Sequence, residues 1–464
     1  MSTPTSTYTI KSHGPIHGLS TYPSTTELSN LTAIVTGANG LSGYNMVRVL
    51  AAAPERWEKI YCLSRGEPSE SFFEDLGLGA GDGEGLKGVR ERVEHVAVDF
   101  MDGGEEIARA LKERIPRVDH VFFFSYSQPA QEGNVLGMWS DAKALTQVNA
   151  TLLSNFLSAL KISSLNPKRI LLQTGAKHYG FHIGPATNPS FESDPRVTLE
   201  ENFYYAQEDA LESYCTAAST STAKVSWNVV RPSYIIGTTP SNTGSLNHLL
   251  GLAIYASVQA HLNQPLYFPG DYVAWDRELC QSSAFLNAYF EEWVVLTDNA
   301  ANEAFNIQDG LGFTWGRFWP ELAGWVGIGW CPPESKEEGQ EGEGKYRVTR
   351  SRYTETPRGY GPSGKTYSTF SLQEWSSQPS IHRAWAELVA KHNLTLFDSF
   401  SRPQTRAQVF GMTDSAVLGG WPLSLSMRKA REKGFFGTVD SIESARLAIK
   451  ELGRLRVVPP IKDG

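Results

Sequence analysis

The chain has 464 residues, of which 41% are hydrophobic and 20% charged, and its formal net charge at pH 7 is -8. This length predicts roughly two or three folding units with ample material for a buried core. The negative charge and the lack of a basic stretch argue against a surface that follows nucleic-acid phosphates, so we expect no nucleic-acid partner.

The four cysteines, Cys62, Cys215, Cys280 and Cys331, are widely separated along the chain. Without a Cys-x-x-Cys pair they argue against both a zinc site and a disulfide framework, and we predict no metal. They are typical of small core residues in a reducing compartment.

Residues 1–30 are rich in Ser and Thr, and we expect them to form a flexible segment. They lack the apolar run of a signal peptide and the arginines of a transit peptide. The most apolar helix-like stretch, Leu249 to Leu262, is shorter than the roughly twenty residues that a membrane span needs. We therefore predict a cytoplasmic protein without membrane contact.

From residue 31 to about 240, strand-like and helix-like segments alternate, which is typical of a parallel sheet covered by helices on both faces. The expected strands are Thr32–Thr36, Lys59–Ser64, Val93–Asp99, Val118–Ser125, Arg169–Thr174 and Ser226–Arg231. The expected helices are Tyr44–Ala53, Glu105–Arg114, Lys143–Leu160 and Tyr204–Ala217. This pattern predicts an α/β fold with a Rossmann-like, doubly wound parallel sheet that binds a dinucleotide.

After Gly237 the pattern becomes mostly helical, and we expect residues 241–464 to cap the substrate site. The expected elements are helices at Leu246–Leu262, Leu279–Leu296 and Phe313–Gly327 and one strand at 304–307 that returns to the sheet. Two glycine-rich stretches predict loops, at Leu76–Gly88 and in a mobile insertion at 332–369.

A glycine motif follows the first strand of the alternating region and precedes a helix. Gly37 would allow the tight turn, Gly40 the approach of a pyrophosphate, and Gly43 close packing of helix on strand. The helix N-terminus would then present free N–H groups to phosphate. The alternative is a tight turn without a ligand. The predicted cofactor contacts here are Thr36, Gly37, Asn39, Gly40 and Leu41.

The end of the second strand distinguishes the two nicotinamide cofactors. NAD-binding proteins tend to place an acidic residue there, whereas this chain has Ser64 and Arg65. A guanidinium at this point suits the 2′-phosphate of NADPH, although Glu67 lies close by and Arg65 as a solvated surface residue is the alternative.

Two further strand ends supply predicted cofactor contacts. Asp99 and Phe100 would face the adenine, and Ser125 and Tyr126 would lie beside the nicotinamide ribose. All four could also be ordinary strand-end residues.

Lys177 follows an apolar strand, and Tyr204 opens a helix. Short-chain dehydrogenases usually carry tyrosine and lysine four residues apart on one helix, but the residue four after Tyr204 is Glu208. The displaced lysine predicts a changed reaction. We favour Tyr204 over Tyr205 as the catalytic tyrosine, and the alternative for Lys177 is a solvated residue at a strand end.

Several motifs in order resemble the progesterone 5β-reductase/iridoid synthase-like (PRISE) family, an atypical branch of the short-chain dehydrogenases. The resemblance spans nearly the whole chain and rests on Thr174–Tyr179, Asn202–Asp209, Val230–Gly237, Pro265–Gly270, Asn302–Asn306, Met427–Lys429 and Gly434–Gly437.

The resemblance implies reduction of the C=C bond of enones and enals with NADPH. It implies Tyr204 and Lys177 as catalytic residues that also touch the cofactor, with Thr174, Pro232, Ser233 and Ile235 as further cofactor contacts. The insertion after Pro332 and the stretch Gly180–Ile183 depart from the family pattern, so steroid and iridoid substrates are not carried over.

Conjugate reduction builds negative charge on the carbonyl oxygen. Tyr204 would bond to this oxygen, and Lys177 would stabilise the charge and lower the pKa of the tyrosine. We predict a small, mostly apolar enone or enal as substrate. The aromatic residues of the second half that line its pocket or pack in the core are Tyr267, Phe268, Trp275, Trp315, Trp319 and Trp421.

Two other functions fit the same residues. One is an NADPH-dependent carbonyl reductase, and the other is a regulatory protein that binds NADP(H) without turnover. The oligomeric state stays open, with a homodimer as one alternative.

Overall fold

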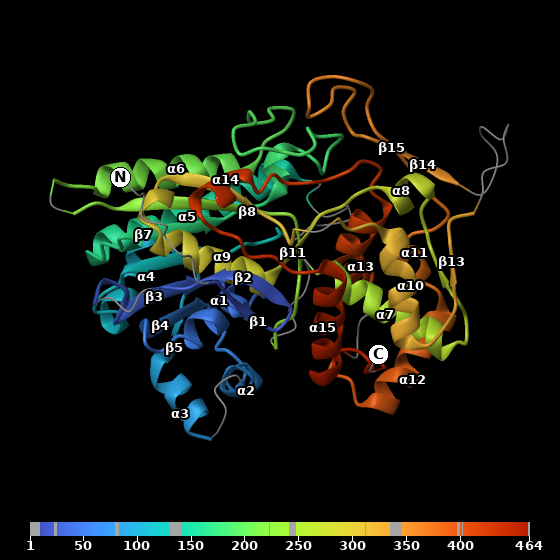
Figure 1. The fold of residues 1–464 in the computed structure, drawn as a ribbon, viewed down its shortest axis with the longest axis horizontal. Coiled ribbons are helices and arrows are strands. Elements are labelled where there is room, and N and C mark those ends of the chain that lie inside the picture. Colours follow the sequence, from blue (N-terminus) through green and yellow to red (C-terminus); the bar gives the residue numbers. More distant parts are fainter. Residues whose placement is uncertain are drawn as a thin grey trace, which may run out of the picture.

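A parallel sheet of seven strands, in the order β12-β8-β7-β6-β3-β4-β5, organises one side of the molecule (Figure 1). Its strands are β3 (Leu31–Thr36), β4 (Trp57–Ser64), β5 (Val93–Ala97), β6 (His120–Phe123), β7 (Arg169–Gln173), β8 (Ser226–Pro232) and β12 (Glu303–Ile307). The computed structural model describes residues 10–22, 26–78, 83–129, 139, 141–221, 223–240, 247–310, 312–334, 346–396, 400 and 402–462. The predicted doubly wound α/β fold is confirmed, including the strand expected at 304–307.

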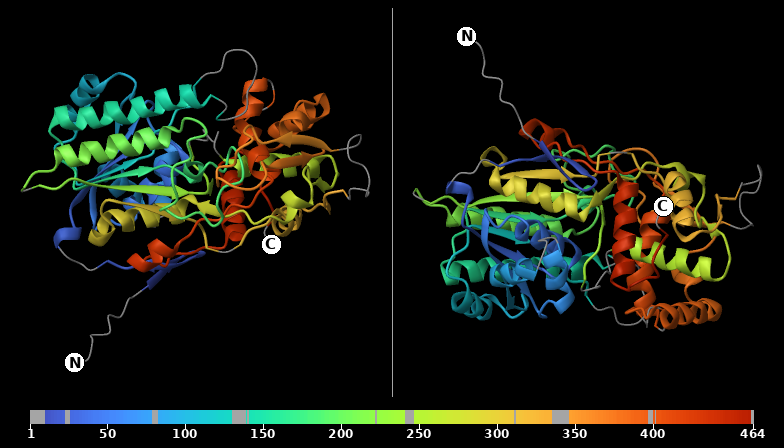
Figure 2. Two further views of the ribbon diagram at one scale, coloured as in Figure 1. Left: turned by 90° about the horizontal axis from the view of Figure 1, so that it is seen from above. Right: turned by 60° about the horizontal axis from the view of Figure 1, so that its bottom comes forward.

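Helices cover both faces of the sheet (Figure 2). One face carries α4 (Gly104–Arg114), α5 (Ala142–Ser163) and α6 (Phe203–Ala218), and the other carries α1 (Leu41–Ala51) and α9 (Ala284–Leu296). Alternate strand residues serve the two layers: Ile34 and Phe123 pack in the core under α5, whereas Val35 and Phe122 pack in the core under α1 and α9.

The order of the strands places a topological switch between β3 and β6. From β3 the chain moves through β4 to β5 at one edge, and from β6 it moves through β7 and β8 toward the other edge. Ligands of open parallel sheets bind in the crevice at the carboxyl ends of the strands at such a point.

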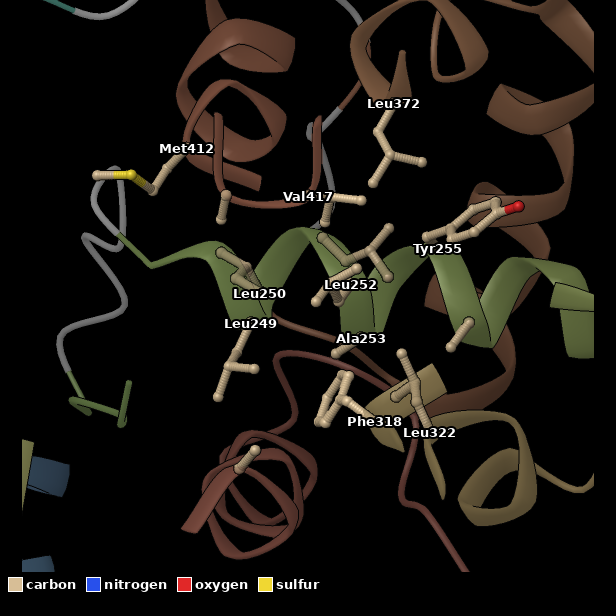
Figure 3. Close-up of a cluster of buried hydrophobic side chains, with 14 of the residues drawn as sticks. Leu249, Leu250, Leu252, Ala253, Tyr255, Phe318, Leu322, Leu372, Met412 and Val417 are labelled. Atoms are coloured by element: carbon tan, nitrogen blue, oxygen red, sulfur yellow. The ribbon is translucent and has the colours of Figure 1, made fainter. Parts of the chain in front are cut away.

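The other side of the molecule is mostly helical and has its own core (Figure 1). Its helices are α7 (His248–His261), α8 (Tyr272–Asp276), α10 (Trp315–Val326), α11 (Leu372–Trp375), α12 (Pro379–His392), α13 (Pro403–Leu418) and α15 (Ser441–Arg454). Helix α7 is buried on almost all sides because apolar residues occur all around it. Figure 3 shows Phe318 and Leu322 on one side of it, and Leu372 and Val417 on the other.

The remaining elements are short. They are β9 (Tyr234–Ile236) with β11 (Gln281–Ser283), β10 (Leu266–Tyr267) with β13 (Trp330–Cys331), the antiparallel pair β14 (Arg347–Arg350) and β15 (Lys365–Ser368), and α14 (Arg428–Lys433). None of the helices in the described ranges is long and apolar enough to cross a membrane. All four cysteines are free.

Two stretches of the chain have a secondary structure that differs from the sequence prediction. The stretch predicted as a loop at Leu76–Gly88 lies largely in α2 (Glu70–Leu78) and α3 (Gly83–Arg92), because Phe72 and Phe73 of α2 pack in the core beneath α1. The segment Leu279–Leu296 begins with the strand β11 and becomes helical only at Ala284.

The N-terminal segment has more structure than expected. Strands β1 (Ile10–His13) and β2 (Ile16–Ser20) pair with each other, and Ile16 and Leu19 are buried in the core. Within the predicted insertion, residues 335–345 lie outside the described residues, and β14 and β15 occupy part of the remainder. The division at residue 240 and the mobility of the insertion stay predictions.

Candidate active site

The glycine motif forms a tight turn between β3 and α1. Gly37 has φ +63°, which favours glycine, and its N–H donates to the Leu63 carbonyl of β4 at 2.9 Å. A side chain at Gly43 would place its first carbon 2.3 Å from the Gly37 oxygen, so only glycine allows this packing of α1. The structure therefore gives Gly37 and Gly43 the geometric roles that the motif predicts.

The N-terminus of α1 fits a phosphate. Gly40 is the N-cap and supplies no side-chain bond to the first turn, where Leu41 is half-buried. Asn39 Oδ1 is buried and has no hydrogen-bond partner among the described residues. The N–H groups at a helix N-terminus can bind phosphate oxygens, and the Asn39 oxygen can accept a hydrogen bond from a ribose hydroxyl. The Thr36 hydroxyl instead accepts bonds from the backbone that follows β6.

At the end of β4, Arg65 is exposed and forms no hydrogen bond or ion pair with any described residue. Ser64 is engaged: its hydroxyl donates to the Gly66 carbonyl at 2.9 Å and lies 3.2 Å from Asn39 Nδ2. The Arg65 guanidinium is thus left without a polar partner among the described residues.

The predicted cofactor contacts that follow β5 and β6 differ in their surroundings. Phe100 packs in the core against Phe123 and Phe156, so its ring does not face the crevice, and Asp99 accepts a bond from the Met101 amide. Ser125 and Tyr126 are half-buried beside the switch point. The Tyr126 ring lies 5.8 Å from the ring of Phe203 at the start of α6.

Lys177 lies on a short 3-10 helix, η2 (Ala176–Tyr179), just beyond β7. It is 2% exposed, and its ammonium has no hydrogen-bond partner within the described ranges. Its Nζ lies 5.5 Å from the centre of the Trp139 ring and 5.2 Å from that of Phe203. Burial lowers the pKa of Lys177 to about 8, Glu200 opposes this shift, and Arg352 adds to it.

Tyr204 lies in the first turn of α6 and is half-buried. Its hydroxyl lies against the turn after β7, since a side chain at Gly175 would come within 3.2 Å of Tyr204 Oη. Burial, with smaller contributions from Tyr126 and Glu208, raises the pKa of Tyr204. The net shift is upward and Lys177 is not among its causes, so the lowering expected from Lys177 is not seen; Tyr204 stays protonated and can donate a hydrogen bond.

Asn202 connects the two predicted catalytic residues. It is the N-cap of α6, where its Oδ1 accepts a bond from Tyr204 N at 3.1 Å. Its Nδ2 donates to the Lys177 carbonyl at 3.1 Å. One buried carboxamide thus fixes η2 relative to α6. The sequence carried the signal, since Asn directly before a helix is a preferred cap, but not the bond to Lys177.

The Tyr205 hydroxyl forms two hydrogen bonds with the backbone. Its hydroxyl donates to the His178 carbonyl at 2.6 Å and accepts from Val197 N at 2.9 Å. Its neighbour Tyr204 has no such anchors among the described residues, which supports the choice of Tyr204.

Glu208, the residue four after Tyr204, belongs to a buried network. It accepts a bond from Arg231 at 3.1 Å and lies 3.2 Å from His178 Nδ1. Tyr179, next to Arg231, donates to Asn306 of β12 at 2.6 Å. Although burial opposes it, His178 and Arg231 hold the pKa of Glu208 below its usual value. The Glu208 carboxylate therefore links α6, β8 and η2, at the position where short-chain dehydrogenases usually carry a lysine.

The remaining predicted contacts lie after β7 and β8. Thr174 is buried, Pro232 ends β8, and Ile235 on β9 is half-buried. The Ser233 hydroxyl donates to the Cys280 carbonyl at 2.6 Å. Gln173, which the sequence did not single out, donates to the Ser42 hydroxyl of α1 at 2.9 Å. Most of the predicted site residues therefore follow the carboxyl ends of the parallel strands, although the Phe100 ring packs in the core and Ile235 lies on β9 outside the seven-stranded sheet.

A cavity of about 420 Å³ adjoins this edge. It is lined by Trp139, by Phe181, His182 and Ile183 after η2, and by residues of the helical part. Of the six aromatic residues considered from the sequence, Trp421 lines it. Phe268, Trp275, Trp315 and Trp319 are buried in the core, and Tyr267 is exposed.

The family model described as a PRISE-like Rossmann-fold domain matches residues 89–351, more than half of the chain. The chain belongs to this family. The resemblance inferred from the motifs is thus confirmed.

Three relatives align along almost the whole chain. The short chain dehydrogenase gsfE of Penicillium aethiopicum is 29% identical over 436 residues, which cover 92% of this chain and 99% of the relative. The 3-oxo-Delta(4,5)-steroid 5-beta-reductase of Arabidopsis thaliana is 26% identical over 438 residues, or 92% and 93%. The (S)-8-oxocitronellyl enol synthase of Catharanthus roseus is 26% identical over 439 residues, or 92% and 92%.

Proposed function

We propose that this PRISE-family protein is an NADPH-dependent reductase of the C=C bond of α,β-unsaturated carbonyl compounds. The observation that carries the proposal is Lys177, a buried ammonium without a hydrogen-bond partner among the described residues. Asn202 fixes the element that carries it against the helix that presents Tyr204. A buried cation without a hydrogen-bond partner, on an element that is held against the helix of a protonated tyrosine, suits an oxygen that becomes negative during the reaction.

The turn around Gly37 and the N-terminus of α1 would hold the pyrophosphate of the cofactor. Arg65 would bind the 2′-phosphate, since no described residue occupies its guanidinium. The bound nicotinamide supplies a hydride.

The chain's own groups act on the substrate oxygen. Tyr204 donates its hydroxyl hydrogen to the carbonyl oxygen, and Lys177 faces the same oxygen with its positive charge. When the β carbon accepts the hydride, the C=C electrons move to the oxygen as an enolate. A proton from solvent at the α carbon then completes a saturated carbonyl compound.

The relatives support this chemistry. A 3-oxo-Delta(4,5)-steroid, the compound in the name of the Arabidopsis relative, contains a C=C bond conjugated to a ketone. An identity of 26% does not establish that the two proteins share a substrate.

A panel of enals and cyclic enones with NADPH or NADH tests the proposal. We expect NADPH oxidation with the saturated carbonyl compound as product, and a strongly reduced rate of both with Lys177→Met and Tyr204→Phe. Tyr205→Phe is the matched control, because that tyrosine is anchored elsewhere. An allylic alcohol as product would instead show a carbonyl reductase. Tight NADPH binding without any turnover would show a nucleotide-binding protein.

A further inference from the structure

The cavity beside η2 is more polar than an apolar enone requires. Besides its aromatic residues it is lined by three arginines, Arg277, Arg350 and Arg352. Hydroxyl groups of Ser351, Thr366, Ser368 and Ser415 also border it. Its volume of about 420 Å³ is in the range of small-molecule sites.

Arg277 is a buried cation that forms no ion pair with a carboxylate of the described residues. It is 8% exposed, and its guanidinium donates to the backbone carbonyls of Trp421 and Ala416. No carboxylate of the described residues forms an ion pair with it, and its Nε has no hydrogen-bond partner there. Burial lowers its pKa to about 10, although Tyr234 and Asp271 oppose the shift, so it remains charged at neutral pH. A buried charge of this kind is costly unless an anion approaches it.

Arg350 adds a second uncompensated charge. It ends β14, is exposed to the cavity, and forms no ion pair with a described residue. Arg352 differs, because its guanidinium bonds to Glu200 at 3.0 Å.

The acid in the lining is already engaged. Asp414 accepts bonds from the backbone N–H groups of Leu372 and Gln373 at 2.7 and 3.2 Å, at the start of α11. Burial raises the pKa of Asp414 to about 6. Asp414 is held by the N-terminus of α11, and its single negative charge is outnumbered in the lining by the positive charges of Arg277 and Arg350.

The wall of the cavity is continuous with the proposed reaction site. The Trp139 ring lines the cavity and lies 5.5 Å from Lys177 Nζ. Trp421 donates to the Phe181 carbonyl at 2.7 Å, and its own carbonyl accepts from Arg277. A substrate in the cavity can thus have one end near Lys177 and the other near the arginines.

We propose that the substrate is an enone that carries a carboxylate, which Arg277 and Arg350 bind while Lys177 and Tyr204 act on the carbonyl oxygen. This inference rests on the proposed function and names the class of its substrate. Arginine binds a carboxylate through two parallel hydrogen bonds, and the hydroxyl groups of the lining satisfy the remaining lone pairs.

The test compares two substrates that differ only in charge: a 2-cyclohexenone with a propanoate side chain and the methyl ester of the same compound. The variants are Arg350→Gln and Arg277→Lys, which keeps a charge in the core. Arg347→Gln is the matched control, because Arg347 lies on the same strand, pairs with Glu374 and does not line the cavity.

In the wild type we expect kcat/KM for the acid to exceed that for the ester by about tenfold or more. Arg350→Gln should remove most of this preference, Arg277→Lys should reduce it, and Arg347→Gln should leave it unchanged. An ester reduced as well as the acid, or a preference that survives in both arginine variants, would overturn the inference and leave the proposed reaction standing.

A binding measurement separates this inference from the proposed reaction. Calorimetric titration with the saturated keto acid, cyclohexanone propanoate, needs no turnover. Binding that Arg350→Gln abolishes, in a protein that reduces no enone of either charge, would keep the anion site and remove the proposed reaction. No binding of the keto acid by the wild type would overturn the anion site itself.

Discussion

Replacing Lys177 with Met should make the protein more stable and less active. The pKa of Lys177 falls from 10.5 to about 8 because the side chain is buried. That difference of about 2.5 units corresponds to about 3 kcal/mol that the charged lysine costs the folded state at pH 7. Methionine fills much of the same space without a charge, so Lys177→Met should raise the free energy of unfolding by up to about 3 kcal/mol.

The effect has a defined dependence on pH. The charged Lys177 lowers the free energy of unfolding by its full amount below pH 8, where the lysine is charged in the folded and the unfolded state. This destabilisation disappears as pH rises through 10.5. Urea unfolding of wild type and variant at pH 7 and pH 9.5 should therefore show the difference falling to about half or less. If Lys177→Met is no more stable than wild type at pH 7, or if the difference in their free energies of unfolding does not change with pH, the charged lysine does not destabilise the fold as inferred.

The same variant tests catalysis. Loss of a group that stabilises an oxyanion typically lowers turnover about 10²–10³-fold. Wild-type turnover should decline as pH rises through about 8, where Lys177 loses its proton, whereas the slower Lys177→Met should lack this step. Unchanged turnover in the variant would contradict the proposed role.

Three further changes probe the site. Tyr204→Phe should lower turnover about 10²–10⁴-fold with NADPH binding nearly intact, and finding this loss in Tyr205→Phe instead would reverse the assignment. Arg65→Ala should raise KM for NADPH about tenfold or more, or about 1.4 kcal/mol, with little effect for NADH; equal losses would show that Arg65 does not read the 2′-phosphate. Asn202→Ala should lower kcat and cost about 1 kcal/mol of stability, whereas Asn202→Asp, which keeps the helix cap but loses the donor to Lys177, should separate the two effects.

Much of the fold was readable from periodicity. Apolar runs such as that of β6 alternate with amphipathic helices, and such runs suit strands that are buried on both faces. The proximity of most candidate site residues could be predicted as well, because parallel strands bring the residues after their carboxyl ends to one edge. Gly37 and Gly43 have the geometry that their spacing indicated.

The features of the fold and the candidate site that the sequence did not predict depend on tertiary contacts. Residues 10–20 include many polar residues, yet Ile16 and Leu19 pack in a core that is formed by elements distant in the sequence. The glycine-rich stretch after Leu76 enters helices because the aromatic residues of α2 are buried. No local pattern around Arg277 shows that it is buried beside a cavity, since its neighbours come from residues more than a hundred positions away. The direction of the Tyr204 pKa shift depends likewise on burial that the sequence does not display.

The central claim is that reduction occurs at the carbon β to the carbonyl. The most direct measurement uses NADPH that carries deuterium at the transferable position of the nicotinamide, with a cyclic enone as substrate and NMR of the product. The account predicts deuterium on the β carbon of a saturated ketone, and the same label distribution at a lower rate with Lys177→Met. Deuterium on the carbonyl carbon of an allylic alcohol would contradict it.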